Sequence, residues 1–257
     1  MSGREGETDA EQAAPSGDER APVPSSTTQT EASQHPRQVY VRRRGRMTRG
    51  QARALETLQT RFVIEPQDTS FEDYSADREP APLGVEIGFG MGQALAEWAL
   101  ERQDWRLLGI EVYQPGIGSL LLQLEEAGAT NVRVLEADAR EIFERWLPAA
   151  SVREIHIYFP DPWPKKRHAS RRIVQPDTLA VFANALEPGG LLHLATDWQS
   201  YAEWMLECAQ GEPRLRNLAA GFAPRPDDRP VTRFEARGQR LGHDVWDLKL
   251  ERVANEP

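Results

Sequence analysis

Short apolar runs alternate with amphipathic segments from residue 83 to the end of the chain. The runs at 83–89, 105–112, 131–138, 153–159 and 191–197 are rich in Val, Ile and Leu and have the length of buried strands. Segments of helical periodicity lie between them, at 96–103, 119–128, 140–147, 176–186 and 201–210. This alternation predicts a doubly wound α/β fold with a mostly parallel sheet. The last alternating run, 243–253, is expected to pair antiparallel at the sheet edge.

The first 39 residues differ in pattern from the rest. Residues 1–39 contain no Leu, Ile, Phe, Tyr or Trp, and seven acids against three bases give them a net charge of −4. Such a segment cannot bury enough apolar surface to fold, so we expect a disordered acidic tail at 1–39 and one folded domain at 40–257. The domain opens with a basic arm of six arginines between Arg42 and Arg53. Within it, Thr48 and Gln51 form a capping-box pattern for a helix through about Thr60, and the segment 69–82 is expected to be a loop.

A glycine-rich turn follows the first predicted strand. Gly88, Gly90 and Gly92 permit a tight turn and close approach of a ligand, although a strand-to-helix turn also needs glycine for packing alone. Glu111, at the end of the second strand, is suited to accept both hydroxyls of a ribose. The spacing G-x-G-x-G differs from the dinucleotide pattern, and Glu86 just before it would repel a pyrophosphate but suit a sulfonium or ammonium group. S-adenosylmethionine is therefore the favoured cofactor.

Other acids after strands are candidates for the same edge of the sheet. Asp138 follows the third strand, where it would meet the adenine amino group of such a cofactor or cap the next helix. Asp197 follows the fifth strand and has the same two interpretations, a site residue or a cap for the helix that begins near Gln199.

The most informative stretch follows the fourth strand. Three prolines at 160–164 stiffen a loop that holds Asp161 and Trp163. Five cations follow, with His168 among them and no acid, next to the Trp163 ring. Cations beside a stacking surface suit a phosphate backbone and a base, whereas the simpler interpretation is a solvated basic loop. The five cations are Lys165, Lys166, Arg167, Arg171 and Arg172.

Composition changes this picture less than the distribution of charge does. A net charge of −9 over 257 residues argues against a polyanionic partner, yet the tail carries −4 of it and the cations gather in 42–53 and 165–172. A single cysteine, Cys208, excludes an internal disulfide and favours a reducing cytoplasmic setting, with this thiol in the core. We expect no membrane partner, because no apolar run approaches the length of a membrane span. The spacing of the five histidines supports no metal site.

The motifs EIGFGMG, GIEV, YFPDPWPKKRH, ATD and TRFE together resemble those of the bacterial tRNA (guanine-N(7)-)-methyltransferase family, over about residues 38–252. The resemblance implies a class I methyltransferase (Rossmann-like) fold of about seven strands, with tRNA as partner, S-adenosylmethionine as cofactor, and a monomer or homodimer. It implies methyl transfer to a guanine in the variable loop of tRNA. Arg233 stands where the family more often has Lys, and it keeps the charge.

The resemblance also implies roles for individual residues. The cofactor contacts it implies are Glu86, Gly88, Gly90, Glu111, Asp138 and Asp161, and Asp161 is also the implied catalytic residue. The implied substrate contacts are Lys165, Asp197, Thr232, Arg233, Phe234 and Glu235. The implied RNA contacts are Arg167, His168, Ala169, Ser170, Arg171 and Arg172.

The chemistry of a guanine ring nitrogen sets what Asp161 must do. This nitrogen carries a free lone pair at neutral pH, so no base has to remove a proton before it attacks a sulfonium methyl group. Positioning then supplies most of the rate, up to about 7–11 kcal/mol. We expect Asp161 to orient the base and stabilise its developing charge. Another RNA or small-molecule methyltransferase, a nicotinamide-dependent oxidoreductase and a non-enzymatic RNA-binding protein are the alternatives.

Overall fold

A computed structural model of the chain describes residues 45–76, 80–227, 229–231, 235 and 244–254. The expected tail at 1–39 and the arginines at 42–44 lie outside the described residues, as do Thr232, Arg233 and Phe234. Within the described part, no helix has the length and apolar character that a membrane crossing requires.

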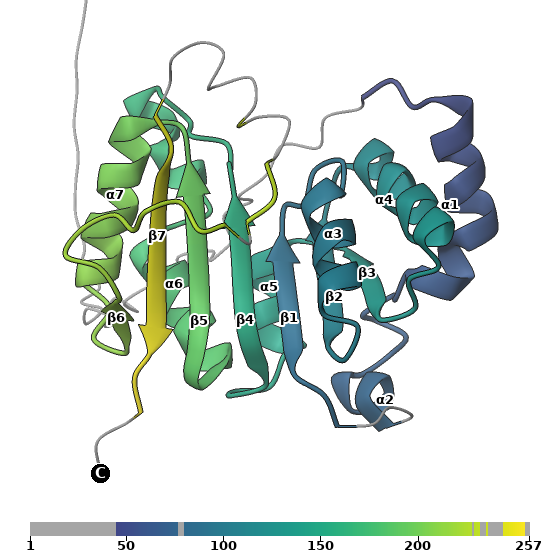
Figure 1. Cartoon of the computed structure of the whole chain (residues 1–257), viewed down its shortest axis with the longest axis horizontal. Coiled ribbons are helices and arrows are strands. Elements are labelled where there is room, and N and C mark those ends of the chain that lie inside the picture. Colours follow the sequence, from purple (N-terminus) through teal and green to yellow (C-terminus); the bar gives the residue numbers. More distant parts are fainter. Residues whose placement is uncertain (1–44, 77–79, 228, 232–234, 236–243, 255–257) are drawn as a thin grey trace, which may run out of the picture. The chain divides into compact units, whose positions relative to one another are not determined.

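The centre of the fold is a seven-stranded sheet in the order β3-β2-β1-β4-β5-β7-β6. All neighbouring strands from β3 to β5 are parallel, and β7 runs antiparallel to both β5 and β6 (Figure 1). The doubly wound α/β prediction is therefore confirmed. The strands are β1 (Leu83–Ile87), β2 (Arg106–Glu111), β3 (Val132–Glu136), β4 (Val152–Tyr158), β5 (Leu186–Thr196), β6 (Leu215–Asn217) and β7 (Trp246–Arg252).

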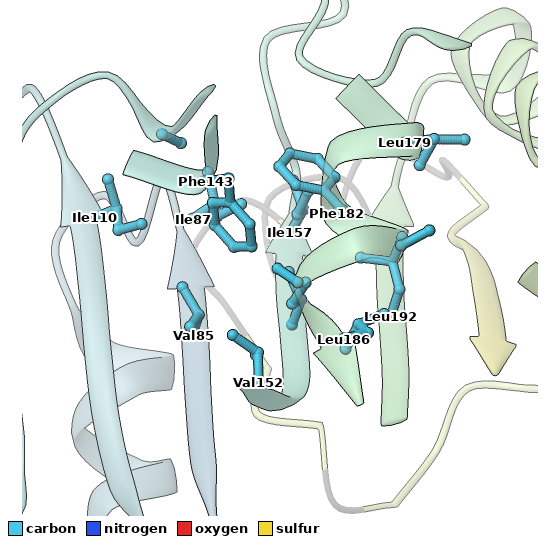
Figure 2. Packing of buried hydrophobic residues seen from close by; sticks show 14 of the residues in the cluster. Val85, Ile87, Ile110, Phe143, Val152, Ile157, Leu179, Phe182, Leu186 and Leu192 are labelled. Carbon is cyan, nitrogen blue, oxygen red and sulfur yellow. The ribbon is translucent and has the colours of Figure 1, made fainter. Parts of the chain in front are cut away.

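Helices cover both faces of the sheet, and each face has its own apolar cluster. One face packs against α1 (Arg49–Phe62), α3 (Gln93–Glu101) and α4 (Gln114–Ala127). The other face packs against α5 (Ala139–Arg145), α6 (Pro176–Ala185) and α7 (Gln199–Gln210). On this second face the rings of Phe143 and Phe182 meet edge to face, 4.8 Å apart, above inward side chains such as Val85 and Ile157 (Figure 2). Cys208 lies in the same cluster, as the sequence predicted.

Polar side chains replace apolar ones on the α3 face of the central strands. Glu86 of β1, His156 of β4, His193 of β5 and Lys249 of β7 are register partners, so their side chains share this face. Trp98 of α3 stacks on His156, with ring centroids 3.9 Å apart. The sheet therefore carries a row of polar groups from β1 to β7 next to an otherwise apolar core.

Besides boundaries that shift by up to five residues, as at the starts of α4 and β5, two elements differ from the sequence prediction. The final strand is antiparallel as expected, but it is not at the edge, because the short strand β6 pairs with its outer side. Three residues are too few to produce a visible alternation, so β6 could not be recognised in the sequence. The segment 69–82, expected to be a loop, contains the helix α2 (Phe71–Ala76), where Tyr74 packs into the core and Ser70 Oγ accepts a hydrogen bond from the Asp73 amide.

The basic arm leads into α1 through the predicted capping box. The Thr48 hydroxyl accepts a hydrogen bond from the Gln51 amide at 3.2 Å, and the Gln51 side chain accepts one from the Thr48 amide at 2.9 Å. The helix packs on α4, where the close approach requires Gly118: a Cβ there would lie 2.6 Å from the Gln51 carbonyl oxygen. The arginines Arg46, Arg49 and Arg53 remain exposed.

Replacing Thr48 with alanine removes one of the two reciprocal bonds that begin α1. We expect the free energy of unfolding in urea to fall by about 1 kcal/mol. Thr60→Ala, an exposed threonine late in the same helix, is the control and should change stability by less than about 0.5 kcal/mol. Equal effects of the two substitutions would show that the cap does not stabilise the fold.

Candidate functional site

A cavity of about 650 Å³ opens at the carboxyl ends of β1, β2, β3 and β4. The chain leaves β1 toward β2 and β3 and then returns to form β4 on the other side of β1. Crevices for ligands form at such a switch point, because the two connections diverge there. The expected cofactor and catalytic residues that line the cavity are Gly88, Gly90, Glu111, Asp138 and Asp161.

The glycine turn after β1 forms one wall of the cavity. Gly88 and Gly90 have φ values of +70° and +57°, and an added Cβ at either would meet no atom within 4 Å. The left-handed conformation explains the glycines, and the open space beside them is what a ligand would fill. Helix α4 fits tightly against this turn, since a Cβ on Gly116 would lie 2.0 Å from the Gly90 carbonyl oxygen.

Glu111 is fixed by backbone amides at the end of β2. One carboxylate oxygen accepts hydrogen bonds from the amides of Val112 and Tyr113, at 2.7 Å and 3.0 Å, and the other accepts one from Gly90 at 2.9 Å. Burial raises the pKa of Glu111, whereas these three amide bonds act in the opposite direction and nearby Asp161 raises it further. The carboxylate is thus held in one orientation toward the cavity and links β2 to the glycine turn.

Asp138 caps α5 and also lies at the cavity, so its cap role is confirmed and its contact with the cofactor stays a prediction. Its side chain accepts a hydrogen bond from the Arg140 amide at 2.8 Å and caps α5, and the same residue lines the cavity. Burial raises the pKa of Asp138, and its backbone hydrogen bonds partly offset this increase.

The sequence left Asp197 as a site residue or as the cap of α7. The N-cap of α7 is Trp198, so the second interpretation does not hold.

Glu86 does not line the cavity. Its side chain is buried, with 2% of its surface exposed, and its Oε2 has no hydrogen-bond partner in the described part of the chain. Burial first, and the negative charge of Glu111 second, raise the pKa of Glu86 from 4.5 to about 8. A carboxyl group with an unsatisfied buried oxygen favours a donor or a cation nearby, which fits the ammonium group of the expected cofactor.

The loop after β4 holds Asp161 between two residues with unusual backbone angles. Phe159 and Trp163 have φ values of +51° and +43°, a region that bulky residues adopt at a cost of about 1–3 kcal/mol each. Such a conformation persists only where neighbouring groups hold it in place. The Phe159 amide donates to the carbonyl of Ala195 at 2.8 Å, and the Arg171 guanidinium lies 5.1 Å from the centre of the Trp163 ring. Asp161 itself is exposed and lines the cavity.

The basic segment forms the short 3-10 helix η1 (Lys166–Arg171) directly after this loop. Lys165, Arg167 and Arg171 are exposed, and the ring of His168 meets that of Trp163 edge to face at 5.8 Å. Desolvation and the neighbouring cations lower the pKa of His168. Arg172 differs from the other cations of the segment because it is buried.

Glu235, the described member of the TRFE motif, lies in a buried ion network. Its side chain is fully buried, and its carboxylate accepts hydrogen bonds from Arg229 at 2.8 Å and 2.9 Å and from Arg225 at 2.7 Å. Arg229 is fully buried as well and lies 2.8 Å from Asp247 of β7. Its guanidinium is also 5.5 Å from the centre of the Phe159 ring. The network joins Arg225, Arg229 and Glu235 to β7 and to the start of the Asp161 loop.

A buried chain of hydrogen bonds continues from this network into the polar row. Burial lowers the pKa of His193 to about 4, so its ring is neutral at pH 7. A carboxylate can only accept, so His193 Nε2 carries the hydrogen and donates to Asp247 at 2.7 Å, and His193 Nδ1 accepts from the Tyr158 hydroxyl at 2.9 Å. Tyr158 immediately precedes Phe159, so the chain fixes the end of β4 from which the Asp161 loop begins.

Several residues of this site were not recognised in the sequence. Gly45 and Tyr113 line the cavity, and they approach so closely that a Cβ on Gly45 would lie 2.4 Å from the Tyr113 hydroxyl. Gly45 interrupts the arginine run, and in the sequence this interruption was the available signal of a close contact. Arg225 and Arg229 gave no signal, because arginines in a proline-containing segment look like solvated residues until the tertiary structure buries them.

Replacing Gly116 with alanine should disturb the glycine turn directly, because the new Cβ would overlap the Gly90 carbonyl oxygen. We expect the dissociation constant for S-adenosylmethionine to rise at least about tenfold, measured by calorimetry, which corresponds to about 1.4 kcal/mol. Gly118→Ala is the matched control, since its Cβ would meet α1 and not the turn. If both variants bind the cofactor like the natural protein, the turn is not part of its site.

Replacing Glu86 with glutamine should change how stability depends on pH. The folded protein keeps a proton on Glu86 that the unfolded chain releases, so stability without cofactor falls as pH rises from about 4.5 to about 8. Glutamine cannot titrate, so Glu86→Gln should flatten this decrease in urea unfolding curves. Glu126→Gln, on the exposed side of α4, should leave the slope as it is. An unchanged slope in Glu86→Gln would contradict the raised pKa.

Comparison with known proteins places this site in a family. Residues 80–248 match the family model described as a putative methyltransferase. The chain is 53% identical over 215 residues to the tRNA (guanine-N(7)-)-methyltransferase of Paracidovorax citrulli (strain AAC00-1), covering 84% of this chain and 86% of that protein. It is 50% identical over 213 residues to that of Thiobacillus denitrificans (strain ATCC 25259 / T1), covering 83% and 94%.

Solved structures agree on the fold. The 16S rRNA methyltransferase KamB superposes with a TM-score of 0.55 at 16% identity, over 72% of this chain and 95% of that one. The aminoglycoside resistance methyltransferase NpmB1 gives a TM-score of 0.50 at 16% identity, over 72% and 94%. At such identities the likeness concerns the class I methyltransferase fold alone. The sequence relatives are much closer, and on their evidence the chain belongs to the tRNA (guanine-N(7)-)-methyltransferase family.

Proposed function

We propose that this protein transfers a methyl group from S-adenosylmethionine to the ring nitrogen at position seven of a guanine in the variable loop of tRNA, in the cytoplasm. The observation that carries the proposal is the meeting of three parts at one edge of the sheet. These are the glycine-lined cavity, the Asp161 loop and the exposed cations that follow this loop. The family membership supports the same reaction.

The residues of the cavity suit S-adenosylmethionine, which supplies an electrophilic methyl group when bound. Glu111, fixed by three amides, presents acceptor oxygens to the ribose hydroxyls, and Asp138 accepts from the adenine amino group. Gly88 and Gly90 leave room for the cofactor beside the turn. Glu86 is outside the lining of the cavity but stands two residues before Gly88, and its buried carboxyl group is our candidate partner for the positive charge of the methionine end.

The exposed cations suit the tRNA backbone. Lys165 and Arg167 follow the Asp161 loop, and Arg46, Arg49 and Arg53 lie on the arm and its helix. Their charges would displace counterions from phosphates, so the affinity for tRNA should fall steeply with salt despite the net charge of −9. Lys165, Asp197, Thr232, Arg233 and Phe234 remain our candidates for contacts to the target nucleotide, as the family resemblance implies. The resemblance implies such a contact for Glu235 as well, but its carboxylate is buried and paired with Arg225 and Arg229.

Asp161 acts by orientation and charge in this proposal. The guanine nitrogen needs no deprotonation, so its attack depends on alignment with the methyl group. A positive charge develops on the purine during transfer, and the carboxylate of Asp161, exposed at the mouth of the cavity, stabilises this charge. Phe159 and Trp163, whose positive φ values the surrounding structure maintains, fix the course of the backbone on either side of Asp161.

The proposed reaction is tested with radiolabelled S-adenosylmethionine and unmodified tRNA. We expect label to enter tRNA at a guanine of the variable loop that becomes sensitive to alkaline cleavage. A transcript with adenine at that position is the matched control and should accept no label. Cofactor binding without transfer to tRNA would point to another methyltransferase, and labelling elsewhere in the tRNA would contradict the assigned position.

Replacing Asp161 with asparagine keeps the shape of the side chain and removes its charge. We expect kcat to fall by about 10²–10³-fold, with a much smaller change in KM for tRNA, because the charge is needed most in the transition state. Asp104→Asn, exposed just before β2 at the opposite end of the sheet, is the control. Normal turnover by Asp161→Asn with unchanged tRNA binding would disprove the role.

A further inference from the structure

We propose that Arg172 is a positioning residue that holds the Asp161 loop in its active shape and that, unlike the exposed cations beside it, it does not contact RNA. The inference rests on the proposed function and divides the basic segment by role. The expectation from sequence assigned the whole run from Arg167 to Arg172 to RNA.

Arg172 is placed to hold the loop and not to reach a phosphate. Only 8% of its surface is exposed. Its Nε donates a hydrogen bond to the carbonyl oxygen of Pro162, the residue after Asp161, at 2.9 Å. Its guanidinium stacks over the ring of Tyr201 on α7, 4.8 Å from the centroid. One side chain thus connects the Asp161 loop to a helix of the second face of the sheet.

Tyr201 gives this connection a fixed base. The Tyr201 side chain is fully buried, and its hydroxyl accepts a hydrogen bond from the Val174 amide at 3.2 Å. The backbone of Arg172 is held as well, because its amide donates to the Ala169 carbonyl at 3.1 Å and ends η1. The guanidinium therefore has little freedom to leave Pro162.

The composition of the loop explains why it needs an outside donor. Pro160, Pro162 and Pro164 have no amide hydrogen, so the loop offers few donors for its own carbonyl groups. The positive φ values of Phe159 and Trp163 add strain that the loop cannot relieve internally. The charged Arg172 side chain donates to the carbonyl of Pro162, the residue adjacent to Asp161. It supplies a donor that the loop lacks and stabilises the strained backbone.

The environment of Arg172 also argues against a phosphate contact. Within the described part of the chain Arg172 forms no ion pair with a carboxylate, so a carbonyl dipole and an aromatic face stabilise its charge. To reach a phosphate, the guanidinium would have to leave both Tyr201 and Pro162. Arg167 needs no such rearrangement, because its side chain already faces solvent.

The test compares Arg172→Met and Arg172→Lys with Arg167→Met in the full-length protein. Two quantities are measured, kcat at saturating tRNA and cofactor, and the slope of log tRNA affinity against log salt concentration. We expect Arg172→Met to lower kcat at least about tenfold and to leave the salt slope unchanged. We expect Arg167→Met to weaken tRNA binding and reduce the slope by about 1, as the loss of one phosphate contact should.

Arg172→Lys separates charge from shape and serves if the methionine variant does not fold. Lysine keeps the charge but cannot stack a planar group on Tyr201 while bonding Pro162, so kcat should stay well below that of the natural protein. A reduced salt slope in either Arg172 variant, or an unchanged kcat in Arg172→Lys, overturns the inference. If the natural protein methylates tRNA, such a result refutes only the role of Arg172. If the natural protein methylates no tRNA, the proposed function and this inference are refuted together.

Discussion

The pairing of β1 with β4 is the constraint on which the site depends. These parallel neighbours send their following segments in different directions, one toward β2 and the other along the Asp161 loop toward β5. The cavity lies between the two connections. Each expected cofactor residue that lines it is either the last residue of a strand or in the segment just after one. The fold therefore brings together acids that are far apart in the sequence.

The arginines near the site divide into two groups that only burial distinguishes. Arg46, Arg49, Arg53 and Arg167 face solvent and suit the long-range attraction of a polyanion. Arg172 and Arg229 are buried, and each contacts the Asp161 loop from its own side, the first through Pro162 and the second through the Phe159 ring. Because they are buried, these two arginines add little to the long-range attraction of a polyanion, and they stabilise the strained loop instead.

The acids of the site show a related division. Glu111 and Glu86 both lose water on folding, and burial raises both pKa values. Glu111 gains three amide donors in return, whereas one oxygen of Glu86 gains none. The native state thus includes a carboxyl group whose environment improves when a cation binds nearby.

The sequence by itself determined the strands β1 to β5 and β7, the helices between them and the capping box of α1, because these depend on periodicity and local hydrogen bonding. It also predicted that Glu111, Asp138 and Asp161 lie at one edge of the sheet with the glycine turn, because the carboxyl ends of parallel strands meet there, but not that Glu86 and Asp197 fall outside the lining of the cavity. The tertiary structure alone decided that β6 covers the outer side of β7, that Glu235 pairs with Arg229, and that Arg172 is buried while Arg167 is exposed. These features depend on contacts between segments distant in sequence. Whether a charged side chain meets water or a buried partner is fixed only when those segments pack, so no local pattern could reveal it.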